Sequence, residues 1–449
     1  MKKYFPLFFG LALFFSFDFS FGQSETTIQI RDSLQQVIVG VLVFNQDKSL
    51  VYTSNQSGEI IHPAFLPQDS ITFQHPSYQP QKYLFQTLLE NAEPIILRLN
   101  TFDLGEVVVS ANKWEQNPRE VPLKISRISS EAIALGNPQT AADLLGLSNE
   151  VFIQKSQLGG GSPMIRGFST SSVLLVIDGV RMNNAIFRGG NVQNVISLDA
   201  ASIERTEILF GPGSVIYGSD ALGGVMDFHT LTPQLSTEDK WILKGNGLLR
   251  YSSANQEKTA HLDLNLAQRK WSLLSSLSFS DFGDLRMGNR GRESYQRREY
   301  VESIDGQDQI IQNSQPNIQR FSGYSQFNLL QKIRFQPNLR LDLRYAYHYS
   351  RSSNVPRYDR LIERRDGVLR FAEWFYGPQT WQMHHFQLKY VRKNPLFDQT
   401  RLTLAYQDYE ESRHDRRLDN PVLRNRGEGV SILTANLDFD KDINQKSTL

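Results

Sequence analysis

The most regular pattern of apolar and polar residues lies in the second half of the chain. Between residues 339 and 350 the odd positions are all Leu or Tyr, whereas the even positions are mostly Arg, Asp, His and Ser. Residues 261–268 and 401–410 alternate in a similar way. Because successive side chains of a strand point to opposite faces, this period of two predicts β-strands with one apolar and one polar face.

Eight long strands are predicted in this region. They lie near residues 241–251, 257–268, 270–281, 319–335, 338–350, 381–392, 400–413 and 429–441. The connections alternate between short turns and the long segments 282–318, 351–380 and 414–428. Long strands joined in this way are typical of outer-membrane β-barrels, whose apolar face meets lipid. A large soluble β-protein is the alternative, but it does not explain the alternation in loop length.

The number of strands bears on whether the barrel is complete. Eight strands form a barrel too narrow to hold a large domain. The chain ends Ser-Thr-Leu, whereas outer-membrane barrels commonly end on an aromatic residue. We therefore expect residues 238–449 to be the N-terminal part of a larger barrel and the chain to be a fragment or a truncated product. An open sheet edge is not tolerated in lipid, so the chain alone is not expected to form a working pore.

The first 22 residues have the pattern of a secretory signal peptide. Lys2 and Lys3 precede the apolar run 6–17, and Ser20 and Gly22 are small residues at the expected cleavage site. An N-terminal anchor helix is the alternative. The chain has no cysteine, so a secreted product cannot use disulfides. Its net charge of +1 provides no strong field for binding nucleic acid, which we do not expect as a partner.

Two zones of different composition separate the signal peptide from the long strands. In residues 23–100, short β-branched runs are divided by turns at 55–58 and 66–69, which predicts a small β-sandwich. Residues 114–233 mix buried-strand runs, glycines and one helical stretch. Thr140 is the predicted N-cap of that helix, and Asp143 is its third residue, as in a capping box.

The glycine-rich stretch FGPGSVIYGSDALGGVMDF (210–228) invites comparison with nucleotide-binding loops. Gly213 and Gly218 have P-loop spacing, but Ser219 and Asp220 follow where that loop needs Lys and Ser or Thr. A Rossmann loop would need its third glycine at Ile216. The glycines are therefore interpreted as residues of tight turns in a compact, strand-rich unit.

Two segments, SPMIRGFSTSSVLLVIDGVRMNN (162–184) and SIERTEILFGPGSVIYGSDALGGVMDF (202–228), closely resemble the plug domain of TonB-dependent outer-membrane receptors. The resemblance implies a plug over 114–233, folded inside a 22-stranded barrel. The fold class is then mainly β: a signal peptide, a small sandwich, an α+β plug and part of an antiparallel transmembrane barrel. The plug motif residues are Arg166, Gly167, Asp178, Gly179, Gly211, Pro212, Tyr217, Gly218, Gly223 and Gly224.

The linker 101–113 contains DLGEVVVSA, which resembles a Ton box, the segment that a TonB-type energy transducer binds by strand addition. Its residues are Leu104, Glu106, Val107, Val108, Val109 and Ser110. The alternative is an ordinary first strand of the plug. Residues 23–100 resemble the carboxypeptidase-regulatory-like domain that precedes the plug in many receptors, which implies a periplasmic accessory module.

The resemblance implies active import of a scarce ligand, such as an iron chelate or haem, across the bacterial outer membrane. The ligand-binding residues are unknown. Arginine-rich segments at 286–299, 357–365 and 413–426 suit an anionic ligand, or else the phosphates of lipopolysaccharide beside the membrane lipid. Alternatives are a signalling or adhesion receptor with little transport, and a non-functional truncated receptor.

Two details of the sequence depart from the family or limit its chemistry. Many family members have Arg before Gly-Pro, where this chain has Phe210, and Arg166 is the candidate for a plug residue that pairs with the barrel. His384 and His385 are neighbours on a strand, so one faces lipid and the other the lumen. No catalytic motif or metal-site spacing is found, and we expect neither an enzyme nor a cofactor.

Overall fold

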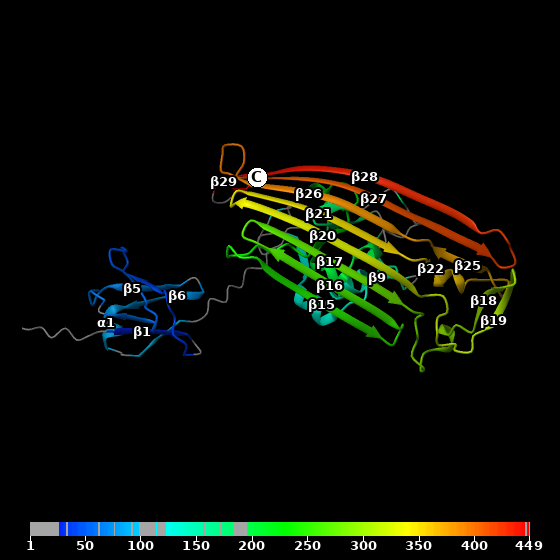
Figure 1. The fold of residues 1–449 in the computed structure, drawn as a ribbon, viewed down its shortest axis with the longest axis horizontal. Coiled ribbons are helices and arrows are strands. Elements are labelled where there is room, and N and C mark those ends of the chain that lie inside the picture. The colour runs from blue at the N-terminus through cyan, green and yellow to red at the C-terminus, as the bar shows by residue number, and fades with distance from the viewer. Residues whose placement is uncertain are drawn as a thin grey trace, which may run out of the picture. The chain divides into compact units, whose positions relative to one another are not determined.

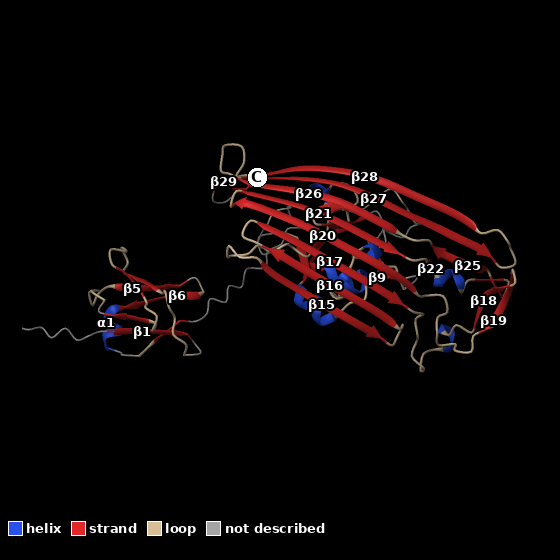
Figure 2. Ribbon diagram, viewed as in Figure 1, coloured by secondary structure: helices blue, strands red, loops and turns tan. Residues whose placement is uncertain are grey.

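A computed structural model describes the chain at residues 27–32, 35–61, 63–75, 77–90, 93–97, 114, 123–155, 158–169, 172–182, 186, 195–444 and 447–448. The predicted signal peptide and the Ton box residues 104–110 lie outside these residues. The chain divides into two compact units, Met1–Glu106 and Val107–Leu449. Figures 1 and 2 show that strands dominate both units.

The N-terminal unit is a small sandwich of two sheets, with strand orders β4-β1-β7 and β3-β2-β5-β6. Both predicted turns form, because Gly58 N–H donates to Asn55 O and Asp69 N–H donates to Leu66 O, each at 2.9 Å. The elements are β1 (Thr27–Asp32), β2 (Leu42–Phe44), β3 (Val51–Thr53), β4 (Glu59–Ile61), β5 (Ser70–His75), β6 (Tyr78–Leu84), α1 (Phe85–Glu90) and β7 (Ile95–Leu97). The shared core contains the fully buried Ile30, Ile71, Phe73 and Leu97.

The second unit begins with an α+β domain built on a five-stranded sheet of order β12-β11-β14-β13-β8. β11 and β14 are parallel, and the other pairs are antiparallel. The helix after Thr140 forms as predicted, and Asp143 N–H donates to the Thr140 hydroxyl at 3.2 Å. The elements are β8 (Lys124–Ile128), α2 (Ser130–Gly136), α3 (Ala141–Gly146), β9 (Phe152–Gln154), β10 (Ser162–Met164), β11 (Val173–Ile177), β12 (Val180–Arg181), η3 (Val195–Ser197), η4 (Ala200–Ser202), β13 (Ile203–Phe210), α4 (Ser214–Tyr217) and β14 (Gly224–Thr230).

Eight long strands then form one antiparallel sheet in sequence order, which confirms the eight predicted strands. They are β15 (Ile242–Ser252), β16 (Glu257–Ala267), β17 (Trp271–Phe282), β20 (Tyr324–Asn338), β21 (Leu341–Ser352), β26 (Thr380–Val391), β27 (Gln399–Arg417) and β28 (Arg424–Asp440). β20 starts five residues later than predicted, because residues 319–323 belong to the preceding loop. β15 and β28 are the two outermost long strands and do not pair with each other, so the sheet is an open part of a barrel.

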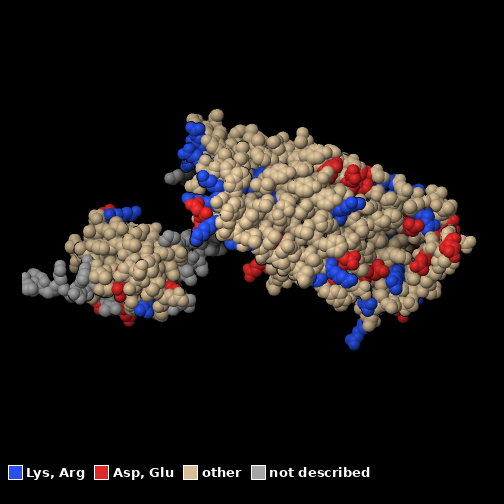
Figure 3. Space-filling model, viewed as in Figure 1, with Lys and Arg blue, Asp and Glu red and all other residues tan. Residues whose placement is uncertain are grey.

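The burial pattern of the long strands is the reverse of that in a soluble sheet. Along β16, polar residues such as Asp263 and Asn265 are buried and the leucines between them are exposed. Leu262 is 49% exposed, whereas His261 is 8% exposed. On the face shown in Figure 3, charges gather at the two ends of the sheet, and the band between them is nearly uncharged. Apolar residues outside and polar residues inside are what a lipid-facing barrel needs.

The predicted long connection 414–428 is mostly strand, because β27 runs to Arg417 and β28 already begins at Arg424. The two other long connections, 282–318 and 351–380, carry short elements of their own. These are η5 (Glu293–Tyr295), β18 (Glu299–Ile304), β19 (Gln307–Gln312), β22 (Val355–Pro356), α5 (Tyr358–Leu361), β23 (Arg364–Arg365), β24 (Val368–Leu369) and β25 (Phe371–Tyr376), and the short strands β29 (Asp442–Asn444) and β30 (Ser447–Thr448) follow β28. No helix among the described residues is long and apolar enough to cross a membrane.

Candidate functional site: the plug and its contact with the barrel wall

The Asp178-Gly179 pair forms the turn between β11 and β12. Ile177 pairs directly with Val180, so these two residues are the whole loop. Both have positive φ, 48° and 84°. A two-residue turn with two positive φ values is the type I′ turn that Asp-Gly favours, because each residue tolerates the left-handed region. The sequence thus places a carboxylate at the tip of a buried hairpin.

Arg166 and Gly167 form a second turn of the same kind, with φ values of 48° and 85°. Ile165 and Phe168 close it by two reciprocal backbone hydrogen bonds of 3.0 and 2.8 Å. The side chain of Arg166 is exposed, and its guanidinium carbon lies 5.2 Å from the centroid of the Phe210 ring. The guanidinium of Arg166 therefore stacks on the Phe210 ring.

The glycines of 211–224 bring this second turn onto the sheet. A Cβ on Gly223 would lie 2.3 Å from Cβ of Phe168, and a Cβ on Gly224 would lie 2.5 Å from the backbone oxygen of Leu209. Such contacts are impossible, so these two positions admit only glycine without a backbone shift. The rest of the loop is compact: Gly211 follows β13 with Pro212, and α4 ends on the buried Tyr217 before Gly218.

The carboxylate of Asp178 joins the plug sheet to the barrel wall. Thr230, the last residue of β14, donates to it from its backbone N–H at 2.9 Å and from its hydroxyl at 2.6 Å. From the wall, Nζ of Lys332 on β20 lies 3.0 Å from Oδ2, and Nε2 of His348 on β21 lies 3.6 Å from it. Burial by itself would raise the pKa of Asp178, but Lys332 and the other partners outweigh it and hold that pKa below its usual range.

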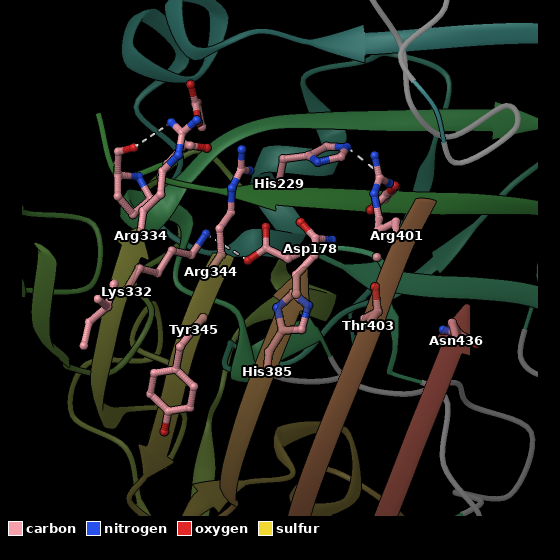
Figure 4. Close-up of a pocket in the computed structure, with 18 of the residues that line it drawn as sticks. Asp178, His229, Lys332, Arg334, Arg344, Tyr345, His385, Arg401, Thr403 and Asn436 are labelled. Carbon is pink, nitrogen blue, oxygen red and sulfur yellow. Dashed lines mark hydrogen bonds and ion pairs between the residues drawn. The ribbon is translucent and has the colours of Figure 1, made fainter. Parts of the chain in front are cut away.

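A cavity of about 410 Å³ lies between the plug and the strands β20, β21, β26, β27 and β28. Figure 4 shows Asp178 and Lys332 directed toward each other at this cavity, with His385 below Asp178 in the view. His385 is 6% exposed and faces inward, whereas its neighbour His384 is exposed on the outer face and bonds to the Tyr345 hydroxyl at 2.8 Å. The prediction that these histidines face opposite sides is confirmed.

The plug sheet also contains two buried carboxylates directly opposite each other. Glu207 of β13 pairs with Asp227 of β14, and they are 0% and 2% exposed. Burial and then the neighbouring Glu207 carboxylate raise the pKa of Asp227 well above its usual range. Nε2 of His229 lies 3.5 Å from Asp227 and 3.6 Å from Glu207. Burial, followed by the charge of Arg205, lowers the pKa of His229 to about 4.

Residues 117–225 match the family model described as TonB-dependent Receptor Plug Domain. Over 157 residues the chain is 37% identical to the vitamin B12 transporter BtuB of Vibrio vulnificus (strain CMCP6), covering 34% of this chain and 25% of BtuB. The chain carries the plug of a TonB-dependent receptor. The open sheet around that plug has the fold of part of an outer-membrane receptor barrel, as the solved structures described next show.

Among solved structures, the copper transporter OprC has a TM-score of 0.53 at 12% identity, covering 70% of this chain and 43% of OprC. The ferric enterobactin receptor PfeA of Pseudomonas aeruginosa, in complex with enterobactin, has a TM-score of 0.51 at 14% identity, covering 72% of this chain and 47% of PfeA. At these identities the likeness shows the fold alone. The matched part is less than half of each solved chain and a quarter of BtuB.

The structure places the plug motif residues at two ends of the sheet. Asp178 and Gly179 lie at one end of the sheet. The other end holds Arg166, Gly167, Gly211, Gly223 and Gly224. The role of Arg166 as a plug residue that pairs with the barrel stays a prediction. A plug-to-barrel ion pair that the sequence did not indicate joins Asp178 to Lys332. In the sequence, Lys332 is marked as inward-facing by its position on the polar face of the predicted strand 319–335.

Proposed function

We propose that this protein is the plug-bearing part of a TonB-dependent transporter that imports a scarce small molecule across the outer membrane. The observation that supports this most directly is the plug itself. It packs on the polar inner face of the partial barrel, with Leu144, Ile208 and Met226 of the plug in one hydrophobic cluster with Trp381 and Met383 of β26. A lumen filled in this way needs an energy source to open.

The proposed energy source is an inner-membrane transducer acting on the Ton box at 104–110. Three consecutive valines favour an extended conformation, and an extended segment can add to a partner's sheet edge by backbone hydrogen bonds. We propose a periplasmic location for the N-terminal sandwich, as a carboxypeptidase-regulatory-like module. Its arrangement in two small sheets supports that assignment.

The outer loops bear on the class of ligand. Most of their arginines already pair with acidic residues of the outer loops. Arg357 pairs with Asp359 of its own loop at 2.7 Å, whereas Arg416 and Arg364 pair with Asp308 and Glu299 of the first loop, at 2.7 and 2.6 Å. This pairing leaves fewer guanidinium groups for an anion than the composition indicates. We therefore propose a metal chelate or a cobalamin, the classes named for the relatives, without a preference for negative charge.

Uptake by the full-length receptor tests the proposal. The receptor is expressed in a host that lacks its own receptors, and uptake of radiolabelled cyanocobalamin, ferric enterobactin and haem is measured with and without the transducer. Val108→Pro removes a backbone donor from the Ton box and should lower uptake more than about tenfold while leaving ligand binding intact. Val108→Ala is the matched control and should keep most of the uptake.

Two results would contradict the proposal. Uptake that is independent of the transducer would argue for a passive pore. Binding of a ligand with no uptake in any strain would favour a receptor for signalling or adhesion.

A further inference from the structure

The inward-facing charges of the barrel strands are mostly compensated within the barrel. Arg334 and Arg344 both lie 2.8 Å from Asp342, and Arg250 lies 2.7 Å from Glu257. Both charges of each pair belong to the wall, although Arg250 also donates to Asn137 Oδ1 at 2.9 Å and to Pro138 O at 3.1 Å in the plug.

Lys332 is different because its partners belong to the plug. Its ammonium lies 3.0 Å from the Asp178 carboxylate and donates to the Thr230 backbone oxygen at 3.3 Å. This ion pair joins a lysine of the wall to a carboxylate of the plug. Lys332 is 9% exposed, so its charge depends on the plug for compensation.

The contact lies where the plug continues into the barrel. Thr230 ends β14, and β15 begins at Ile242. Between them, Arg334 donates to Pro233 O at 3.3 Å, and the Asn265 side chain donates to Gln234 O at 3.0 Å. The wall therefore holds the segment between β14 and β15 at Pro233 and Gln234. Lys332 adds a contact at the tip of the β11–β12 hairpin.

The opposite side of the plug sheet is held differently. β8, the first strand after the Ton box linker, is an edge strand and pairs within the sheet with β13 alone. A force on the Ton box reaches β8 before it reaches the inner strands β11 and β14.

We propose that Lys332 is a positioning residue that anchors the C-terminal end of the plug sheet to the barrel wall. With this end held, plug movement starts from the β8 side and leaves β11 and β14 in place. The anchor's role in movement rests on the proposed import function, but the contact itself is tested without transport.

Cysteine accessibility in the purified full-length receptor, without ligand or transducer, tests the anchor. The chain has no cysteine, so a single reporter is free of background labelling. Thr403→Cys is the reporter, because Thr403 is 4% exposed on β27 and lines the cavity beside the anchor. Its rate of reaction with a charged methanethiosulfonate is measured with and without Lys332→Met.

Losing a charge-assisted hydrogen bond should raise this labelling rate roughly ten- to a hundredfold. A second reporter, Asn255→Cys, lies between β15 and β16, where the Asn255 side chain donates to Gln139 Oε1 of the plug at 3.4 Å. Its labelling rate should change less than about threefold, because Asn255 lies about ten residues along β16 from the level of Lys332. Arg344→Met is the matched control: it removes an inward-facing cation whose partner is in the barrel, and it should leave both reporters unchanged.

An unchanged rate at Thr403→Cys, or equal increases at both reporters, would overturn the anchor. If Lys332→Met does not fold, Lys332→Gln and Asp178→Asn are compared singly and together. An anchor requires that their effects on labelling are not additive, whereas two independent structural roles give additive effects. If labelling follows the anchor but no ligand is imported, the import function fails and the anchor remains.

Discussion

Replacing Asp227 by asparagine should stabilise the plug at neutral pH. Asp227 and Glu207 are buried carboxylates at directly opposite positions of β13 and β14, and like charges in such positions destabilise a sheet. The Asp178 carboxylate also raises the pKa of Asp227, whereas Arg205 and Arg401 lower it. The net result is a pKa well above the usual value. Asparagine has nearly the same shape but cannot ionise.

The sign and the upper limit of the effect follow from linkage. A folded-state pKa above the unfolded value of 3.8 means that the native plug binds the proton more tightly than the unfolded chain. The free energy of unfolding is then highest below pH 3.8 and falls as the pH rises from 3.8 to the folded-state pKa. At pH 7 the loss is at most about 4 kcal/mol, from roughly three pH units at 1.36 kcal/mol each.

Hydrogen exchange provides the assay. Protection of the β13 and β14 amides in Asp227→Asn is compared with the parent receptor at pH 5 and pH 8, always at the same pH. The variant should be the more protected, and by a larger factor at pH 8. Asp178→Asn is the control of opposite sign, because the Asp178 carboxylate is paired with Lys332 and its loss should reduce protection. Lower protection in Asp227→Asn, or an increase that is the same at both pH values, would refute the reasoning.

Three further predictions concern the loops, the glycine motif and the Ton box linker. Hydrogen bonds from Arg416 are the main cause that lowers the pKa of Asp308 to about 2. Arg416→Met should therefore speed proteolysis of the outer loops several-fold. The rate should gain no pH dependence above about pH 4, because Asp308 is ionised there in both proteins. Gly223→Ala should cost about 1–3 kcal/mol of plug stability in urea unfolding through overpacking, and equal stability would contradict the contact. The Arg401 guanidinium lies 4.6 Å from the centroid of the Trp114 ring. Loss of this contact in Trp114→Ala should raise the labelling rate of a cysteine introduced at 104–110 about fivefold. An unchanged rate would show that the contact does not restrain the Ton box.

The sequence determined the strands of the barrel almost completely. The period of two marked all eight, and the predicted inward faces are the buried faces, as for Asp342 and His348 on β21. This succeeds because the contrast between lipid and a polar lumen acts on every residue of a strand, so local pattern and environment agree. The helix after Thr140 was predictable for a similar reason, because its capping hydrogen bond joins two residues only three positions apart. The plug was accessible through its motif, since glycines at fixed spacings record backbone turns and close approaches.

What only the tertiary structure decided is which charges meet. Asp178 and Lys332 are more than 150 residues apart, and no local pattern links them. Arg166 was a candidate to pair with the barrel, and its turn places its guanidinium on the Phe210 ring at the other end of the sheet. The register of β13 and β14, which places Glu207 opposite Asp227, depends on how strands separated by a glycine loop are brought together. Local patterns set which face of a strand is polar, whereas the partner of a polar side chain depends on the packing of the plug against the wall.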